Sequence, residues 1–506
     1  MSISPKVAER ASESQIVSLR PSELKDAAAR LLKSGGRMQM AYAWYPEPGR
    51  IELRYVASIA GRRAFAVWRC EPDGPVPSLA GICPLLSWYE REIMDLFGVK
   101  FLDHPQRHRL VLHDGVVAPC PPFDPAYPSD APLQIRSAKQ SIPDIGGANG
   151  DVQLLPFGPV RGDVLESGEF LFFYIGEAIL HYQPRLFFKH RGMEKRFEGL
   201  DAERGVALAE RVSGVGSIAH ALAYCQAVET AANCTVPPRA RFLRVLLAEL
   251  ERLYNHLHYL GHLCHTTTLK VGEAQGKLLE ERAKQLDCRL TGSRLLRSIL
   301  TIGGLRRDLS PGEWLGSELE ALRQTFAAYA RHLENTNSHL DRLITTGKLD
   351  RRVAFDQGAT GPVQRGSGLD SDLRRDHAYA AYGELPLTVP VRKEGDAHAR
   401  VQVRMAEIEA SIALMQRVLL ELPGGPVRSD YEIEPGAEEL GWSESPRGTL
   451  FYAVHFGEDG KLKRVKIKSP SFSNWRVFPF TVHDTNMMDY AINEASFGLT
   501  IAGCDR

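Results

Sequence analysis

Close pairs of cysteines are missing from this sequence. The chain has eight cysteines, at positions 70, 83, 120, 225, 234, 264, 288 and 504, and no C-x-x-C motif. An iron–sulfur cluster or thiolate-bound zinc within the chain is therefore not expected. No run of about 18 apolar residues occurs, and the first residues carry no apolar signal core. We expect no membrane-spanning helix, no secretory signal and reduced cysteines in the cytoplasm.

The chain also has no excess of either charge. Lys+Arg number 62 and Asp+Glu number 62, so the net charge is zero and nothing indicates a nucleic-acid partner. The Gly-Gly pairs at 146–147 and 303–304 lack the strand–turn–helix context of a dinucleotide fingerprint. Any link to NAD would lie in another subunit.

The sequence predicts an α+β fold with two domains. Residues 1–115 combine a capped helix at 22–33 with alternating strands at 38–44, 51–57 and 64–70, which favours a small domain with an antiparallel sheet. Residues 116–153 are a proline-rich linker or strap, densest in proline at 116–132.

The second predicted domain, 154–506, is rich in helices and has small sheets at its start and end. Strands are expected at 169–175 and 178–182, and short strands and turns from about 426. Helices are expected at 201–231, 238–266, 272–300, 311–345 and 399–421.

The string Trp88-Tyr-Glu-Arg-Glu-Ile-Met-Asp-Leu-Phe-Gly-Val-Lys-Phe101 places Glu90, Arg91, Glu92 and Asp95 within two helical turns. Read alone, it predicts an amphipathic helix with a solvated charged face. As a whole it resembles the C subunit of respiratory complex I (NADH:quinone oxidoreductase), over residues from about 30 to 115. The resemblance implies that these four charged residues serve assembly with neighbouring subunits.

The second domain resembles the complex I D subunit and, more closely, the large subunit of membrane-bound [NiFe] hydrogenases of the formate hydrogenlyase type. A series of strings in the family's order carries this resemblance: Gly158-Pro-Val160, His190-Arg-Gly-Met-Glu-Lys195, Glu249-Leu-Glu-Arg-Leu-Tyr-Asn-His256, Ile302-Gly-Gly-Leu-Arg-Arg-Asp308, Gly358-Ala-Thr-Gly-Pro362, Arg365-Gly-Ser-Gly368, Ser445-Pro-Arg-Gly448, Lys468-Ser-Pro-Ser-Phe472 and Asp505-Arg506. Fused C-like and D-like halves also occur in that hydrogenase group.

The positions that hold the family's metal carry other residues here. The family places four cysteine thiolates around its nickel–iron centre, since soft metals favour soft ligands. Ser213, Gly216, Thr500 and Gly503 stand at these positions, and none has a thiol. We therefore expect neither a nickel–iron centre nor any other cofactor in this chain.

The quinone-binding residues of complex I are also replaced. The family's tyrosine position falls on Gly214 and its histidine position on Leu165, and neither side chain can form a hydrogen bond. A quinone could still enter the cleft, but without the family's usual polar anchors.

Part of the surrounding polar shell is kept. The resemblance matches Arg447 to the arginine that faces the metal's diatomic ligands and Glu166 to the glutamate that relays protons. These two residues could still move protons. Alternatively, they form a structural ion pair or each pairs elsewhere. The resemblance further implies that His190, Arg191 and Glu194 brace a subunit interface.

A histidine-rich stretch leaves two interpretations open. His256, His258, His262 and His265 lie on one predicted helix, and the last three share a face. Imidazoles spaced in this way can bind zinc or copper, but further ligands are not evident. Packed or surface histidines are the other interpretation.

The resemblance implies a peripheral-arm oxidoreductase subunit, inactive alone and not a hydrogenase, on the cytoplasmic face of the cell membrane. The expected partners are a small subunit with a [4Fe–4S] cluster, other peripheral-arm subunits, and antiporter-like and anchor membrane subunits. The complex would translocate ions while this chain passes electrons to an unknown acceptor. The alternatives are an inactive structural or coupling subunit and, less favoured, a quinone reductase.

Overall fold

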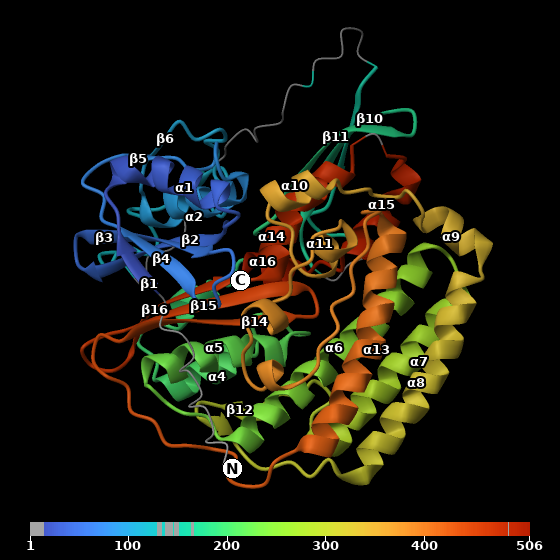
Figure 1. Ribbon diagram of the computed structural model, residues 1–506. Coiled ribbons are helices and arrows are strands. Elements are labelled where there is room, and N and C mark those ends of the chain that lie inside the picture. Colours follow the sequence, from blue (N-terminus) through green and yellow to red (C-terminus); the bar gives the residue numbers. More distant parts are fainter. Residues whose placement is uncertain (1–14, 129–133, 137–144, 146–150, 163–165, 484) are drawn as a thin grey trace.

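The computed structural model describes residues 15–128, 134–136, 145, 151–162, 166–483 and 485–506. A smaller N-terminal domain packs on one side of a larger, helix-rich domain with small sheets (Figure 1). This mixture confirms the predicted α+β class. The division at residues 115 and 153 stays a prediction, because much of 129–150 lies outside the described residues.

The N-terminal domain is built on a four-stranded sheet in the order β1-β4-β3-β2. Strands β2, β3 and β4 are antiparallel, as predicted. The edge strand β1 pairs in parallel with β4, so the purely antiparallel prediction is wrong there. A four-residue edge strand has too little alternation to reveal itself or its direction. The elements are β1 Gln15–Ser18, the 3₁₀ turn η1 Pro21–Glu23, α1 Leu24–Lys33, β2 Arg37–Glu47, β3 Arg50–Ser58, β4 Phe65–Cys70, β5 Val76–Pro77, η2 Pro84–Leu86, α2 Ser87–Phe97 and β6 Phe101–Leu102.

The second domain is organised around a central antiparallel sheet, β14-β15-β16, with helix α5 packed against β14 and β15 (Figure 1). A second sheet, β11-β10-β9, lies away from it. The strands of this domain and of the preceding segment are β7 Val116–Val117, β8 Gln134–Ile135, β9 Gln153–Phe157, β10 Glu169–Ile175, β11 Ala178–Arg185, β12 Leu300–Thr301, β13 Gly304–Leu305, β14 Glu438–Ser445, β15 Gly448–Phe456 and β16 Leu462–Lys468.

The long helices α6, α7, α8 and α13 pack side by side (Figure 1). The predicted helix at 238–266 matches α6. Those predicted at 201–231 and 311–345 are each broken into two, and the first break forms the loop of residues 210–216. The helices are α3 Met193–Arg196, α4 Ala202–Ala209, α5 Ser217–Ala231, α6 Pro238–Thr266, α7 Lys270–Thr291, α8 Gly312–Glu334, α9 Asn337–Leu343, α10 Arg351–Asp356, α11 Pro362–Gly366, α12 Leu373–Asp376, η3 Tyr382–Glu384, α13 Ala397–Glu421, α14 Pro470–Val477, η4 Phe478–Thr481, η5 Met487–Asp489, α15 Tyr490–Phe497 and α16 Ile501–Asp505.

A cluster of buried charges joins the two domains. We call Glu92, Glu194, Arg464, Lys466 and Arg506 the junction cluster. Lys466 Nζ lies 2.7 Å from a Glu92 carboxylate oxygen and 3.0 Å from one of Glu194, and Arg506 contacts both carboxylates. Each of these side chains is buried. The N-terminal domain is therefore fixed to the second domain by ion pairs inside one chain.

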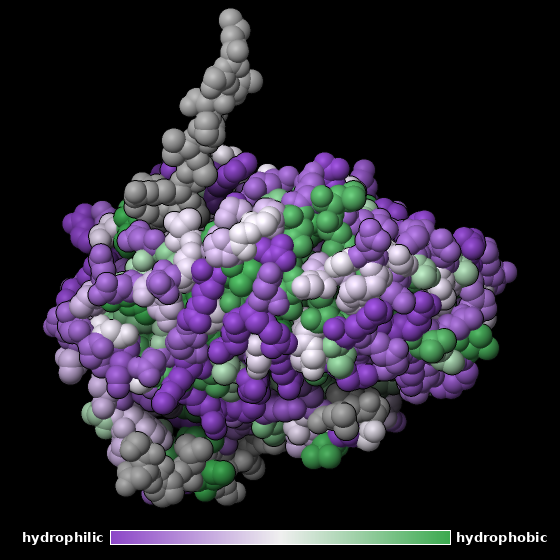
Figure 2. All heavy atoms as spheres, turned by 90° about the horizontal axis from the view of Figure 1, so that it is seen from below, coloured by the Kyte–Doolittle hydropathy of each residue, from purple (hydrophilic) through white to green (hydrophobic). Residues whose placement is uncertain are grey.

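The face of the molecule in Figure 2 is largely hydrophilic, with hydrophobic residues in small separate groups. Among the helices that the structure describes, none is both long enough and apolar enough to cross a membrane.

Candidate functional site

The loop of residues 210–216 and the segment before α16 meet at a small cavity, which we call the cleft cavity. Ser213, Gly216, Thr500 and Gly503, which stand at the family's metal-ligand positions, all line it. The other lining residues are His220, Ser445, Pro446, Arg447, Ser469, Pro470 and Ser471. Its volume of about 10 Å³ corresponds to the room for roughly one water molecule. The lining offers hydroxyl, imidazole and guanidinium groups but no thiol.

Hydroxyl groups occupy part of the space beside the glycines. A Cβ atom at Gly503 would lie 2.6 Å from Thr500 Oγ1, and one at Gly216 would lie 3.2 Å from His220 Cδ2. Thr500 Oγ1 in turn lies 3.0 Å from Ser471 Oγ. The Ser–Thr pair therefore fills the side of the cavity where a larger residue at 503 would otherwise project.

Arg447 has polar partners on both sides of the cleft cavity. Its Nη1 donates to Asn255 Oδ1 of α6 at 2.7 Å, and its Nε donates to the Gly498 carbonyl at 2.8 Å. Burial lowers the pKa of Arg447 to about 10, so the guanidinium stays charged at neutral pH. Arg447 thus holds α6 and the segment leading to α16 together beside the cavity.

Glu166 does not pair with Arg447. Its carboxylate accepts the Ile501 N–H at the start of α16 and lies 3.6 Å from Lys189 Nζ. Among the described contacts, each of the two retained residues pairs elsewhere, which is the second of the structural alternatives. Leu165, which stands at the family's quinone-binding histidine position, lies outside the described residues.

His220 and Glu251 lie behind the loop of residues 210–216. His220 is buried with Nδ1 2.8 Å from the Tyr452 hydroxyl, and burial lowers the pKa of His220 to about 3. The histidine is therefore neutral and oriented by tyrosine. Glu251 of α6 accepts the backbone N–H groups of Ile218 and Ala219 at 2.6 and 3.0 Å, in the first turn of α5.

Glu251 gives the first testable prediction. Burial raises the pKa of Glu251 to about 7, whereas an unfolded glutamate has a pKa of about 4.3. Its contribution to stability is thus present below pH 4.3 and is lost as the pH rises to 7. We expect the stability of Glu251→Gln, relative to wild type, to improve over this pH range. Denaturant unfolding at pH 5, 6, 7 and 8 tests this. Exposed Glu432→Gln is the control, and a parallel pH dependence in both variants would contradict the assignment.

Arg191 holds the two sides of the cleft cavity together. Its Nη2 donates to the carbonyls of Val212 at 2.5 Å and Ala502 at 3.1 Å. Next to it, His190 is exposed and its Nδ1 lies 2.6 Å from the Asp505 carbonyl. Arg191 therefore braces the cleft within this chain, and contact of His190 with another subunit stays a prediction.

The predicted interface role of several charged residues is corrected by their burial. Glu90, Arg91, Glu92 and Glu194 are all buried inside the chain, so they present no solvated face and no surface to a partner. Their partners are internal: Glu90 accepts from Ser78, and Arg91 donates to carbonyls of the loop after α2. Asp95 is half-buried and accepts the backbone N–H groups of Leu110, Val111 and Leu112. The fusion of the two domains makes this an internal interface.

The histidine-rich stretch divides between two faces of α6. His256 is buried and contacts Glu407 at 2.7 Å. The rings of His258, His262 and His265 stack along another face, with centroids 6.2 and 6.3 Å apart. In the described parts of the chain, no group of three or more His, Cys, Asp or Glu side chains is placed to hold a metal ion.

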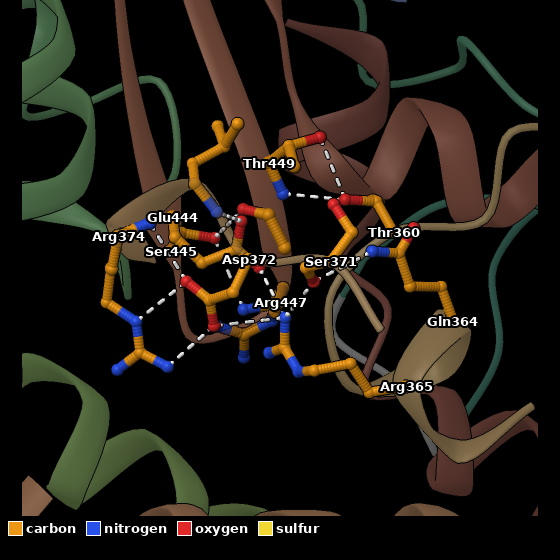
Figure 3. A network of polar contacts seen from close by, with 12 residues as sticks. Thr360, Gln364, Arg365, Ser371, Asp372, Arg374, Glu444, Ser445, Arg447 and Thr449 are labelled. Carbon is orange, nitrogen blue, oxygen red and sulfur yellow. Dashed lines mark hydrogen bonds and ion pairs between the residues drawn. The ribbon is translucent and has the colours of Figure 1, made fainter. Parts of the chain in front are cut away.

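A buried ion network lies beside the cleft cavity, behind Ser445 and Arg447 (Figure 3). Arg365 contacts Glu407 at 2.7 Å, Glu444 at 3.0 Å and Asp372 at 3.2 Å. Burial, followed by the Asp372 carboxylate, raises the pKa of Glu444 to about 7. This network was not predicted, although Arg365 and His256 lie in strings that carry the family resemblance. The Ser-Pro-Ser string likewise gave no sign that Ser469 and Ser471 line the cleft cavity.

Comparison with known families agrees with this architecture. Residues 17–132 match the family described as respiratory-chain NADH dehydrogenase, 30 Kd subunit, and 277–438 and 431–506 match its 49 Kd subunit. Residues 191–281 match nickel-dependent hydrogenase. The matched ranges follow the order of the two domains.

Individual relatives cover most of the chain. Formate hydrogenlyase subunit 5 of Escherichia coli (strain K12) is 31% identical over 459 residues, covering 87% of this chain and 79% of that protein. Hydrogenase-4 component G of the same organism is 32% identical over 416 residues, covering 82% and 72%. The fused C/D subunit of NADH-quinone oxidoreductase from Gluconacetobacter diazotrophicus is 28% identical over 485 residues, covering 85% and 79%.

A solved structure shares the fold. A chain of the membrane-bound sulfane sulfur reductase (MBS), an archaeal respiratory membrane complex, aligns with a TM-score of 0.67 and 27% identity, covering 71% of this chain and all of that one. The fold and the matched segments define a peripheral-arm subunit of complex I-like or hydrogenase-like complexes. The chain belongs to the family of formate hydrogenlyase subunit 5 and the fused C/D subunits of NADH-quinone oxidoreductase. The resemblance predicted from the motifs is confirmed.

Proposed function

We propose that this chain is the large subunit of the peripheral arm of a membrane-associated, ion-translocating complex, and that it works without a nickel–iron centre. In this proposal it passes electrons from a [4Fe–4S] cluster in a partner small subunit to a small acceptor at the cleft cavity. The convergence of Ser213, Gly216, Thr500 and Gly503 around one cavity that keeps Arg447 carries the proposal.

The lining residues do not fit a nickel–iron centre. Such a centre needs soft anionic ligands, whereas serine and threonine hydroxyls are hard, neutral donors at physiological pH. Cys504 follows one of the four positions but does not line the cavity. It is fully buried, and burial raises the pKa of its thiol well above the usual value. A thiolate at the cavity is therefore not provided from this neighbour.

The size of the cleft cavity favours a small acceptor over a quinone head group. About 10 Å³ leaves no room for a ring, although a partner subunit would add a further wall. The occurrence of this fold in a sulfane sulfur reductase supports an arm that reduces something other than protons. Other peripheral-arm subunits and antiporter-like and anchor membrane subunits would complete the complex.

A structural or coupling subunit is the second candidate. Arg447 and Arg191 have internal hydrogen-bond partners on both sides of the cleft, which favours a closed, braced site. In that case the chain would connect the other subunits without receiving electrons.

Metal analysis of the intact complex, purified from native membranes, tests the nickel-free proposal. We expect iron at the stoichiometry of its clusters and no nickel. Stoichiometric nickel bound to this subunit would overturn the proposal, because it would require a metal site without the family's thiolates.

Reoxidation of the pre-reduced cluster by small acceptors, followed by electron paramagnetic resonance, separates the two candidates. We expect acceptor-dependent reoxidation that slows at least ~10-fold in Arg447→Met, because the charged group beside the cavity is lost. The exposed Arg204→Met is the matched control. No acceptor-dependent reoxidation, or equal rates in both variants, would favour the structural candidate.

A further inference from the structure

A second, larger cavity lies between the two domains, apart from the cleft cavity. It has a volume of about 50 Å³, and we call it the interdomain cavity. The N-terminal domain contributes Arg37, Gln39 and Tyr89 to its lining, and the second domain contributes Lys468 and Arg476 among others. None of the described lining residues is an aspartate or glutamate.

The three cations of this cavity have only neutral partners among the described residues. Lys468 Nζ contacts Thr449 Oγ1 at 2.9 Å and Gln39 Oε1 at 3.3 Å. Arg476 donates to the carbonyls of Pro84 and Gln357. Arg37 donates to backbone carbonyls and to the side chain of Gln364, and its buried Nε has no hydrogen-bond partner.

The neighbouring lysine on the same strand shows how this fold treats a buried cation elsewhere. Lys466 and Lys468 both lie in β16 and are both buried, at 1% and 4% exposure. Lys466 pairs with two carboxylates, Glu92 and Glu194. Lys468 has no such counterpart within the described residues. Burial of a cation without an anion is costly, so the missing counter-charge needs a source.

The electrostatics of the cavity agree with a missing anion. Burial, followed by repulsion from Arg37, lowers the pKa of Lys468 to about 7. Burial likewise lowers the pKa of Arg476 to about 9 and that of Arg37 to about 10. All three shifts have the sign expected of cations that lack a nearby negative charge.

We propose that the interdomain cavity binds a small inorganic oxyanion of the phosphate or sulfate type, held by Lys468, Arg37 and Arg476. The anion would supply the counter-charge to residues from both domains and so fasten the N-terminal domain to the second. This site is independent of the cleft cavity and of the function proposed for it.

The size and donors of the cavity suit this ligand class. A volume of 50 Å³ corresponds to roughly three to five water-sized spheres at ~10–15 Å³ each, which is comparable to a tetrahedral oxyanion. The ammonium of Lys468 and the hydroxyl groups of Tyr89 and Ser473 at the lining are hydrogen-bond donors to such oxygens. An extended organic anion would not fit the same space.

Isothermal titration of the full-length chain with inorganic phosphate, and separately with sulfate, in chloride buffer of constant ionic strength tests the proposal. We expect one site per chain for at least one of the two anions, and the two titrations show which is preferred. Lys468→Met should weaken binding at least ~10-fold, because it removes one charge-assisted hydrogen bond. Lys461→Met, an exposed lysine before the same strand, should bind like wild type.

Thermal unfolding keeps the test interpretable. Lys468→Met leaves no carboxylate without its partner, so we expect this variant to fold. The saturating anion should raise the unfolding temperature of wild type and Lys461→Met but not of Lys468→Met. If Lys468→Met failed to fold, Arg476→Met would carry the same comparison. No binding of either anion to wild type, or equal binding to the lysine variants, would overturn the proposal.

Discussion

Replacing Glu194 by glutamine is expected to lower the free energy of unfolding by about 3–5 kcal/mol. Glu194 is shared by three buried cations of the junction cluster, lying 2.6 Å from Arg464, 3.0 Å from Lys466 and 3.1 Å from Arg506. Without it, Glu92 alone would remain to compensate them. Chemical denaturation of wild type and variant at neutral pH measures the difference.

The pH dependence of this loss distinguishes a charge effect from a packing effect. Burial alone would raise the pKa of Glu194, but Lys466, Arg464 and Arg506 together hold it well below its ordinary value. Its contribution is therefore complete above the unfolded pKa of about 4.3 and is lost at lower pH. The deficit of Glu194→Gln should shrink below that pH. Glu198→Gln, which removes a partly exposed i,i+3 pair with Lys195, is the control and should cost far less. Equal losses in the two variants would contradict the role of the junction cluster.

Local periodicity was sufficient to predict the regular elements of the fold. The apolar pattern of 238–266 and the alternation in β2, β3 and β4 are properties of short windows, and the structure has these elements at nearly the predicted bounds. The break between α4 and α5 was missed because apolar residues continue through Val212 and Val215. There, the tertiary contacts of Arg191 hold the chain in a loop.

Long-range charge pairing was beyond the reach of a single sequence. The pattern of Glu90, Arg91 and Glu92 on one helix is typical of a solvated face, yet the partners of Glu92 are Lys466 and Arg506 in the other domain. Nothing in the local sequence distinguishes a glutamate that faces water from one that faces a lysine hundreds of residues away.

The candidate site divides in the same way. The family motifs identified Ser213, Gly216, Thr500 and Gly503 as positions of one site, and the structure places them around one cavity. They could not reveal that Thr500 and Ser471 fill part of it. The interdomain cavity was not predicted, because it is formed by cations from both domains that share no motif.

The second large effect is expected for Arg365→Met in the buried network of Figure 3. Arg365 is 0% exposed and contacts the carboxylates of Glu407, Glu444 and Asp372. Its loss would leave these carboxylates with only Arg252 and Arg374 nearby, which also serve Glu249. Removing one partner of a buried ion network typically costs about 3–5 kcal/mol, so we expect a loss of that size in denaturant unfolding.

The loss in Arg365→Met should grow as the pH rises from 5 to 8. Burial raises the pKa of Glu407, but Arg365 and further partners hold it well below its usual value, so the wild-type carboxylate is charged and compensated throughout this range. In the variant, the buried carboxylates can escape their penalty only by taking up protons, which becomes harder at higher pH. Arg375→Met, on the neighbouring helix turn and paired with Asp370 and Asp376 near the surface, is the matched control. Lysine at 365 should not restore the wild-type stability, because an ammonium cannot reproduce the forked contacts of a guanidinium. A loss in Arg365→Met that equals the control, or that does not change with pH, would show that the network is not held by the charge of Arg365.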